Sequence, residues 1–252
     1  MSKTILITGA SAGIGQHLAI AFARRGYHLA LAARRLDGLA TLKADITKQY
    51  PAVRVEIAAL DVSQLDTVAP TLQQLASTMG GLDIVVANAG IGDGGGPVGT
   101  GGFARDVAVI QTNVLGAMAT IDAAVAIFRK QKHGQVVAIA SVAAARGVPG
   151  AASYSTSKAA IAMYADAARS ELHHTAIKVT TLYPGYIDTA MNRRMKSRPF
   201  LVTVEDGAER VAKLIERGVQ EAAVPGWPWG LVMWLLRRLP TSMIAKQNPF
   251  AE

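Results

Sequence analysis

The amino-acid sequence predicts a doubly wound α/β fold, in which helices cover both faces of a mostly parallel sheet of about seven strands to give a three-layer α/β/α sandwich. Short apolar, β-branched runs alternate with longer helical patterns along the whole chain. The first run, Thr4–Thr8, leads into a glycine-rich turn and then a helix. No break in composition and no internal repeat divides the chain, so we expect a single domain over residues 1–252.

The other strands are expected at further apolar runs. These runs cover residues 28–33, 53–60, 82–86, 135–140, 177–182 and 222–224. Helical patterns lie between them, over residues 39–50, 64–79, 103–128 and 204–218, and in a segment that begins near Tyr154. Because open α/β sheets bind ligands outside the carboxyl ends of their strands, we expect the functional residues in the segments that follow the strands.

Composition and charge narrow the class of protein. Half of the residues are hydrophobic and 17% are charged, which is typical of a globular chain. The chain has no cysteine and its five histidines show no metal-ligand spacing, so we expect no metal site. The absence of a signal-peptide pattern and of an apolar run of about 20 residues favours a cytoplasmic protein.

The formal net charge of +8 indicates an anionic partner, such as a phosphorylated cofactor, a membrane surface or nucleic acid. The basic residues are scattered as pairs, for example Arg24–Arg25 and Arg237–Arg238, and no nucleic-acid-binding motif accompanies them. We therefore expect no nucleic-acid partner.

The glycine-rich turn after the first strand reads Gly9-Ala10-Ser11-Ala12-Gly13-Ile14-Gly15. Glycines let the backbone approach a pyrophosphate, and the N-terminus of the following helix supplies N–H donors and the positive end of the helix dipole. The spacing Gly-x-x-x-Gly-x-Gly differs from the general dinucleotide fingerprint Gly-x-Gly-x-x-Gly, and a plain strand-to-helix turn is the alternative.

Arg34 and Arg35 follow the second expected strand, and no acidic residue occurs between Gly26 and Asp37. At this position an acid binds the ribose 2′-hydroxyl of NAD, whereas an arginine accommodates the 2′-phosphate of NADP. The pair therefore favours NADP(H) as the cofactor. The alternative is that the two arginines only solvate the start of a helix.

Tyr154 and Lys158 lie four residues apart at the start of an alanine-rich helical pattern, so they share one helix face. A free tyrosine holds its proton to about pH 10. A neighbouring ammonium group favours the phenolate, so we expect Lys158 to lower the pKa of Tyr154 and make it a general acid or base near neutral pH. An ordinary helix with a packed tyrosine and a solvated lysine is the alternative.

Taken together, these motifs resemble those of the short-chain dehydrogenase/reductase (SDR) family over nearly the whole chain, and the resemblance implies a Rossmann-like fold. It implies four catalytic residues, which are Asn113, Ser141, Tyr154 and Lys158. It also implies a cofactor-binding set, which is Gly9, Ser11, Ala12, Gly13, Ile14, Gly15, Arg34, Arg35, Asp61, Val62, Asn88, Ala89, Gly90, Tyr154, Lys158, Pro184, Gly185, Ile187 and Thr189.

The resemblance further implies a reaction. A hydride would pass between NADP(H) and a ketone or secondary alcohol, while Tyr154 protonates or deprotonates the substrate oxygen. Ser141 would donate to that oxygen, Lys158 would also bind the nicotinamide ribose, and Asn113 would hold a water. An NAD-dependent dehydrogenase of the same family, a non-catalytic NADPH-binding protein and a membrane-surface interaction protein remain as alternatives.

Two later segments are expected to shape the substrate site. Residues 186–204 would form a substrate loop, and residues 225–252 an apolar C-terminal segment that contains all three tryptophans of the chain. A helix from Gly230 to Leu239 would be too short to span a bilayer. Tryptophans and flanking arginines suit a peripheral membrane contact through residues 226–240. The alternative is a helix that packs on the protein and closes a pocket for an apolar carbonyl or alcohol substrate.

The helices around Asn113 and Tyr154 are rich in alanine, which lets helices approach closely. The residues are Ala117, Ala119, Ala123 and Ala124 in one helix, and Ala159, Ala160, Ala162 and Ala165 in the other. The resemblance implies that these helices pair across a two-fold axis, so we expect a homodimer or homotetramer. The alternative is that the alanines pack on the sheet of their own chain.

Overall fold

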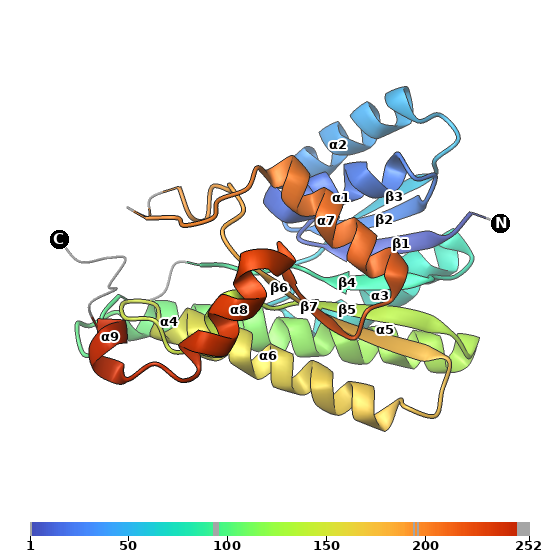
Figure 1. The fold of residues 1–252 in the computed structure, drawn as a ribbon. Coiled ribbons are helices and arrows are strands. Elements are labelled where there is room, and N and C mark those ends of the chain that lie inside the picture. Colours follow the sequence, from blue (N-terminus) through green and yellow to red (C-terminus); the bar gives the residue numbers. More distant parts are fainter. Residues whose placement is uncertain (1, 93–95, 194, 196, 246–252) are drawn as a thin grey trace.

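The structure is a computed structural model that describes residues 2–92, 96–193, 195 and 197–245. Its centre is a seven-stranded sheet in the order β3-β2-β1-β4-β5-β6-β7, and every strand pair is parallel (Figure 1). The strands are β1 (Thr4–Thr8), β2 (His28–Ala33), β3 (Val55–Ala59), β4 (Ile84–Ala87), β5 (Gly134–Ile139), β6 (Ile177–Pro184) and β7 (Glu221–Val224). The predicted doubly wound fold is confirmed.

Helices cover both faces of this sheet (Figure 1). They are α1 (Gly13–Ala23), α2 (Leu36–Gln49), α3 (Leu65–Met79), α4 (Phe103–Ile110), the π-helix η1 (Gln111–Gly116), α5 (Ala117–Gln131), the 3₁₀ turn η2 (Val142–Ala145), α6 (Ala152–Glu171), α7 (Val204–Arg217), α8 (Gly226–Leu236) and α9 (Thr241–Ala245). One core lies between the sheet and α3, α5 and α6, and the other lies between the sheet and α1, α2 and α7.

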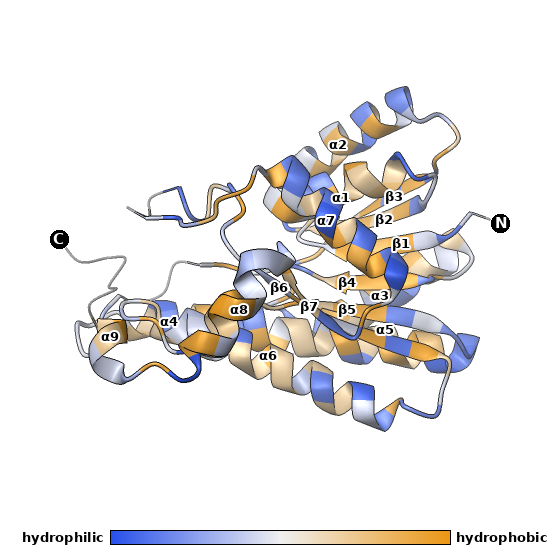
Figure 2. Ribbon diagram, viewed as in Figure 1, coloured by the Kyte–Doolittle hydropathy of each residue, from blue (hydrophilic) through white to orange (hydrophobic). Residues whose placement is uncertain are grey.

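The alternation of side chains along β1 shows how the sequence makes these two cores. Leu6 points into the core with α3, α5 and α6, whereas Ile5 and Ile7 point into the opposite one. A strand that is buried on both faces needs apolar residues at every position, which is why the strands read as continuous apolar runs. Figure 2 shows apolar strands at the centre and polar residues on the outer faces of α2 and α7.

The long helical pattern after residue 103 is one helical segment with a π turn in its middle. Phe103–Gln131 is long and apolar enough by composition to cross a membrane, which corrects the expectation that no segment would be. Within the described chain this segment packs in the domain, because Ile121, Ala124 and Phe128 are buried in the core against the sheet. We therefore describe it as a core helix.

Four of the alanines that were expected to face a partner serve this chain's own core instead. Ala117, Ala123, Ala124 and Ala165 are buried within the subunit. The remaining alanines on α5 and α6 are half-buried or exposed.

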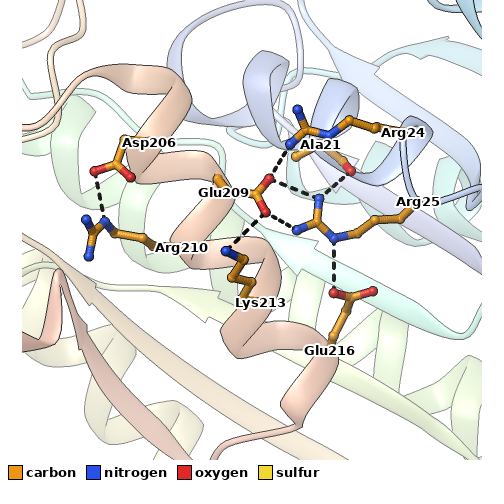
Figure 3. A network of polar contacts seen from close by, with 8 residues as sticks. All are labelled: Ala21, Arg24, Arg25, Asp206, Glu209, Arg210, Lys213 and Glu216. Carbon is orange, nitrogen blue, oxygen red and sulfur yellow. Dashed lines mark hydrogen bonds and ion pairs between the residues drawn. The ribbon is translucent and has the colours of Figure 1, made fainter.

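A charged network fastens the end of α1 to α7 (Figure 3). The Glu209 carboxylate accepts hydrogen bonds from both Arg24 and Arg25, and the Arg25 Nε donates to Glu216 at 3.0 Å. Lys213 adds an ion pair to Glu209 at 3.6 Å. Helix α1 begins in the glycine turn and α7 follows residues 186–203. The network therefore fixes two helices that border the carboxyl ends of the strands, where the site described below lies.

Candidate active site

All the residues named by the sequence lie at the carboxyl edge of the sheet or in the helices that border it. Gly9, Ser11 and Ala12 follow β1, and residues 13–15 open α1. The segments after β2, β3 and β4 contribute Arg34–Arg35, Asp61–Val62 and Asn88–Ala89–Gly90, respectively. Ser141 follows β5, Pro184 ends β6, and Gly185, Ile187 and Thr189 come next.

The glycine turn is packed against the segment that follows β4. Gly9 has a φ of +67°, and a Cβ atom there would lie 2.8 Å from the Cα of Ala89. A Cβ atom on Gly15 would lie 2.6 Å from the side-chain nitrogen of Asn88. Asn88 Nδ2 in turn donates to Thr8 O at 2.8 Å. Only glycine fits at positions 9 and 15, which explains the spacing of the motif.

Thr8, the last residue of β1, is a positioning residue that was not among the predicted cofactor-binding residues. Its Oγ1 donates to Val86 O at 3.2 Å and accepts from the backbone N–H groups of Asn88 and Ala89 at 3.1 and 3.2 Å. One buried hydroxyl therefore connects the ends of β1 and β4. In the sequence, the feature that pointed to this residue was its polar side chain at the end of an apolar strand.

The segment after β6 reaches back to the glycine turn. A Cβ atom on Gly13 would lie 3.4 Å from Thr189 Cγ2. Asn192 supports this segment, because its Nδ2 donates to Ile187 O at 2.7 Å. Ile187 itself is buried against Gly207 of α7 and pairs with Val202 in an isolated parallel bridge.

The polar residues around the ends of β1, β2 and β3 form a second part of this edge. Arg35 extends toward Ser11 with 3.5 Å between Nη2 and Oγ. Burial opposes ionisation of Asp61, but hydrogen bonds from the hydroxyl and backbone N–H of Ser63, with the charge of Arg34, hold the pKa of Asp61 below its ordinary value. Arginines, a hydroxyl and a carboxylate together suit the phosphate, ribose and adenine of a dinucleotide.

Asn113 connects three elements and lies in the π turn. Its side chain accepts from Ile91 N and donates to Ile91 O, both at 2.8 Å, and donates to Ser157 Oγ on α6 at 3.1 Å. A Cβ atom on Gly90 would lie 3.1 Å from Asn113 Oδ1 and 3.6 Å from Lys158 Nζ. π turns inside α-helices occur frequently at functional sites.

Ser141, Tyr154 and Lys158 come together between β5 and α6. Ser141 Oγ donates to Pro184 O at 3.4 Å and caps η2 by accepting from Ala143 N. Lys158 Nζ donates to Ile139 O at 2.9 Å and lies 5.8 Å from the centroid of the Tyr154 ring. A phenol, a hydroxyl and an ammonium group thus share one site, and such a set can transfer a proton and stabilise an oxyanion.

The expected effect of Lys158 on Tyr154 is wrong for this geometry. Burial raises the pKa of Tyr154, and a hydrogen bond with Ser141 lowers it in part. Burial also lowers the pKa of Lys158, to about 8. The loss of water on burial penalises the phenolate and the ammonium alike, and it is the largest influence on both pKa values. Tyr154 is therefore a protonated phenol at neutral pH.

The remaining cofactor residues of the sequence prediction have simpler settings. Val62 is buried, with its carbonyl oxygen 2.7 Å from where a Cβ atom on Gly116 would lie. Ile14 is half-buried in the first turn of α1, and Ala12 is exposed just before it. Of the expected substrate and C-terminal segments, residues 194, 196 and 246–252 lie outside the described part of the chain.

Comparison with known proteins agrees with this geometry. The short-chain dehydrogenase family model matches residues 3–199. The chain is 39% identical over 239 residues to an uncharacterized oxidoreductase of Mycobacterium tuberculosis, covering 94% of both proteins. It is 32% identical over 252 residues to an 11-beta-hydroxysteroid dehydrogenase-like protein of Arabidopsis thaliana, covering 97% of this chain and 83% of that protein.

A solved structure is similar over the same region. The alcohol dehydrogenase of the archaeon Thermococcus sibiricus, complexed with 5-hydroxy-NADP, superposes with a TM-score of 0.80 at 28% identity, covering 89% of this chain and 96% of that one. The family match, the relatives and the site geometry agree, and the chain belongs to the short-chain dehydrogenase/reductase family of oxidoreductases.

Proposed function

We propose that the protein is an NADPH-dependent carbonyl reductase or alcohol dehydrogenase that interconverts an apolar ketone and its secondary alcohol. The observation that carries this proposal is the meeting of Ser141, Tyr154 and Lys158 at the end of β5, beside Asn113. A bound nicotinamide supplies or accepts the hydride. The chain supplies the proton and the position of the substrate.

Each side chain has a role that follows from its setting. Tyr154, which burial keeps protonated, donates its proton to the substrate oxygen during reduction and takes it back during oxidation. The Ser141 hydroxyl donates to the same oxygen, where negative charge develops. Lys158 supplies positive charge next to the phenol and would hold the cofactor ribose. Asn113 keeps Ser157 and the Gly90–Ile91 backbone in place around that lysine.

NADP(H) is the cofactor that the charged residues favour. Arg34 and Arg35 are exposed at the end of β2, where an arginine can bind a 2′-phosphate. The related archaeal alcohol dehydrogenase was solved with an NADP derivative, which supports the same choice. The alternatives are an NAD-dependent dehydrogenase of the same family and a non-catalytic NADPH-binding protein.

A ketone panel tests the proposal. Purified protein would be mixed with NADPH or NADH and ketones that range from short and polar to long-chain and polycyclic, and the reduced-nicotinamide absorbance would be followed. We expect turnover of apolar ketones with NADPH. NADPH binding without oxidation by any ketone, and without reduction of NADP by the matching alcohols, would favour the non-catalytic alternative.

The exposed face of α8 favours an additional membrane contact. Trp227 and Trp234 are 77% and 53% exposed, and the Arg238 guanidinium lies 4.1 Å from the Trp234 ring centroid. The sequence from Ala222 to Ala251 contains no acidic residue. Indole rings beside guanidinium groups suit the interface of an anionic membrane, so we propose that this face docks on one.

Liposome co-sedimentation tests the membrane contact. The full-length protein is expected to bind vesicles that contain phosphatidylserine, and Trp227→Ala/Trp234→Ala should bind several-fold less. Arg217→Ala, an exposed arginine at the end of α7, provides a control for general charge. Failure of the full-length protein to bind vesicles at low salt would end this proposal. In that case, a protein mass in solution above that of the monomer, which Trp227→Ala/Trp234→Ala lowers, would assign the face to a second copy.

We also propose that the protein is a homodimer or homotetramer. The α5–α6 surface keeps an exposed methionine, Met163, and half-buried Ala119 and Ala162 that a partner helix could cover. Light scattering coupled to size exclusion at micromolar concentration would measure the assembly mass. A monomer would contradict the proposal.

A further inference from the structure

Two aromatic rings from the segment after β6 contact the Trp229 indole of α8. Trp229 from α8 meets the rings of Tyr186 and Phe200 edge-to-face, with 5.7 Å between centroids in each pair. Such T-shaped pairs are a favoured geometry of aromatic side chains. We refer to Tyr186, Phe200 and Trp229 as the aromatic wall.

The backbone brings this wall directly beside the catalytic residues. Ser141 Oγ donates to Pro184 O, and the next residue, Gly185, lies against the Trp229 indole: a Cβ atom on Gly185 would lie 2.2 Å from Nε1. Helix α8 also packs on η2, which Ser141 caps. Tyr186 is near enough to Tyr154 for its charge to raise the pKa of that phenol. The wall therefore lies next to the segment after β6 that Ser141 contacts.

Trp229 carries a polar atom without a partner. The residue is only 4% exposed, and within the described residues its indole Nε1 is buried and has no hydrogen-bond acceptor. Buried donors are almost always paired, because an unpaired one loses the hydrogen bonds that water would make. Such an orphaned donor calls for a partner from outside the described residues, and a bound ligand can supply one.

Phe200 is the exposed member of the wall and is held under backbone strain. Its φ is +56°, a left-handed conformation that is costly for a bulky residue, and its side chain is 53% exposed. The strand-like pairing of residues 186–188 with Val202 keeps it there, since Val202 N donates to Tyr186 O at 3.0 Å and Asp188 N donates to Val202 O at 2.9 Å. Phe200 is therefore the member of the wall that faces solvent, and its ring contacts that of Trp229.

We propose that the aromatic wall selects carbonyl substrates that carry a flat ring and a second oxygen next to the reacting carbonyl, and that Trp229 Nε1 donates a hydrogen bond to that second oxygen. The ring packs against Tyr186 and Phe200, and the second oxygen supplies the acceptor that the indole lacks. The assignment rests on the proposed reductase function for its kinetic test, but the hydrogen bond itself can be observed without turnover.

Trp229→Phe is the decisive variant, because it keeps an aromatic ring and removes the N–H. We would measure kcat/KM with NADPH for 1-phenylpropane-1,2-dione, which has the ring and the second oxygen, and for 1-phenylpropan-2-one, which lacks that oxygen. The variant-to-wild-type ratio for each ketone cancels its intrinsic reactivity. The ratio is expected to fall about tenfold further for the dione than for the monoketone, the effect of leaving one hydrogen bond unmade. Trp234→Phe on the exposed face of α8 is the matched control and should change neither ratio.

The indole signals give a readout that is independent of activity. With ¹⁵N-labelled tryptophan the three indoles give three resonances, and the one missing from Trp229→Phe belongs to Trp229. Adding the dione to the NADP-saturated protein should shift this resonance downfield, whereas the monoketone should shift it less.

The outcomes separate the two proposals. Equal losses for both ketones, or a Trp229 resonance that the dione leaves in place, would overturn the role of Nε1. If no ketone were turned over but the resonance still moved with the dione, the reductase proposal would fail and the binding role of Trp229 would stand.

Discussion

Lys158 Nζ donates a 2.9 Å hydrogen bond to the backbone carbonyl oxygen of Ile139 and so ties α6 to the last residue of β5. The lysine is 6% exposed, and burial lowers its pKa to about 8. The protein therefore holds a cation where a cation is costly, which is expected of a residue kept for function.

Lys158→Met should stabilise the protein at pH 7 while it removes activity. A pKa shift from 10.5 to about 8 corresponds to an upper limit of about 3 kcal/mol, and the lost hydrogen bond to Ile139 offsets about 1 kcal/mol of this. We expect the free energy of unfolding, measured in urea without cofactor, to rise by about 1–2 kcal/mol.

The sign of the pH dependence follows from the lower pKa in the folded state. Between pH 8 and 10.5 the unfolded chain binds more protons, so the wild type gains stability as pH rises and the advantage of Lys158→Met shrinks. Lys178→Met, at an exposed lysine of β6, is the control for the loss of one positive charge. A Lys158→Met protein that is less stable than the wild type at pH 7 would contradict the burial argument.

Gly185→Ala should destabilise the protein, because the new methyl group would lie 2.2 Å from Trp229 Nε1. Overpacking of this kind costs about 1–3 kcal/mol. Gly230→Ala, on the same helix as Trp229 with open space around it, should instead be neutral or slightly stabilising. Gly185→Ala should cost less stability in a Trp229→Ala background than in the wild type, because the indole that the methyl group clashes with is gone. An equal cost in both backgrounds, measured by thermal unfolding, would argue against the contact.

Glu209→Gln tests the link between α1 and α7. Hydrogen bonds from Arg25 lower the pKa of Glu209 from 4.5 to about 2 despite some burial, so its contribution is present above pH 4.5 and is lost as pH falls toward 2. We expect Glu209→Gln to lower the free energy of unfolding, measured with a chemical denaturant, by about 1–2 kcal/mol at pH 7. The difference from the wild type should shrink below pH 4.5. Asp206→Asn removes an exposed pair with Arg210 and should cost only about 0.3–0.5 kcal/mol. An equal effect of both variants would mean that the network adds nothing beyond a surface pair.

Arg34→Asp should shift cofactor preference toward NADH. The arginine is exposed at the end of β2, and a carboxylate there would repel a 2′-phosphate and accept from a free 2′-hydroxyl. The ratio of kcat/KM for NADPH to that for NADH is expected to fall at least tenfold. Arg54→Asp, on an exposed arginine just before β3, controls for the change in net charge. A wild type that already prefers NADH would overturn the NADP assignment.

The sequence was sufficient for the sheet and for the placement of the site, since apolar runs mark strands buried on both faces and the motif residues follow those strands. It could not give the electrostatics. The spacing of Tyr154 and Lys158 suggested mutual attraction, but their burial, which decides both pKa values, depends on packing by distant elements. The π turn at Asn113 was also hidden, because a π turn has the same composition as the helix around it.

The C-terminal helix shows a second limit. Its sequence is apolar on all sides, so periodicity could not tell which tryptophan faces the protein. In the structure Trp229 is buried against Gly185, while Trp227 and Trp234 are exposed, so this one helix has both a packed side and a solvent-facing side.

Tyr154→Phe tests the central claim most directly, that the protein reduces a carbonyl by proton donation from Tyr154. The substitution removes one oxygen and leaves the ring, so NADPH affinity measured by fluorescence titration should stay within about twofold of the wild type. The rate of NADPH oxidation at pH 7 with a ketone that the wild type reduces should fall about a hundred- to ten-thousandfold, as expected when a general acid is lost. Intact NADPH binding with that loss of rate is the result we expect, and a rate near that of the wild type would contradict the account.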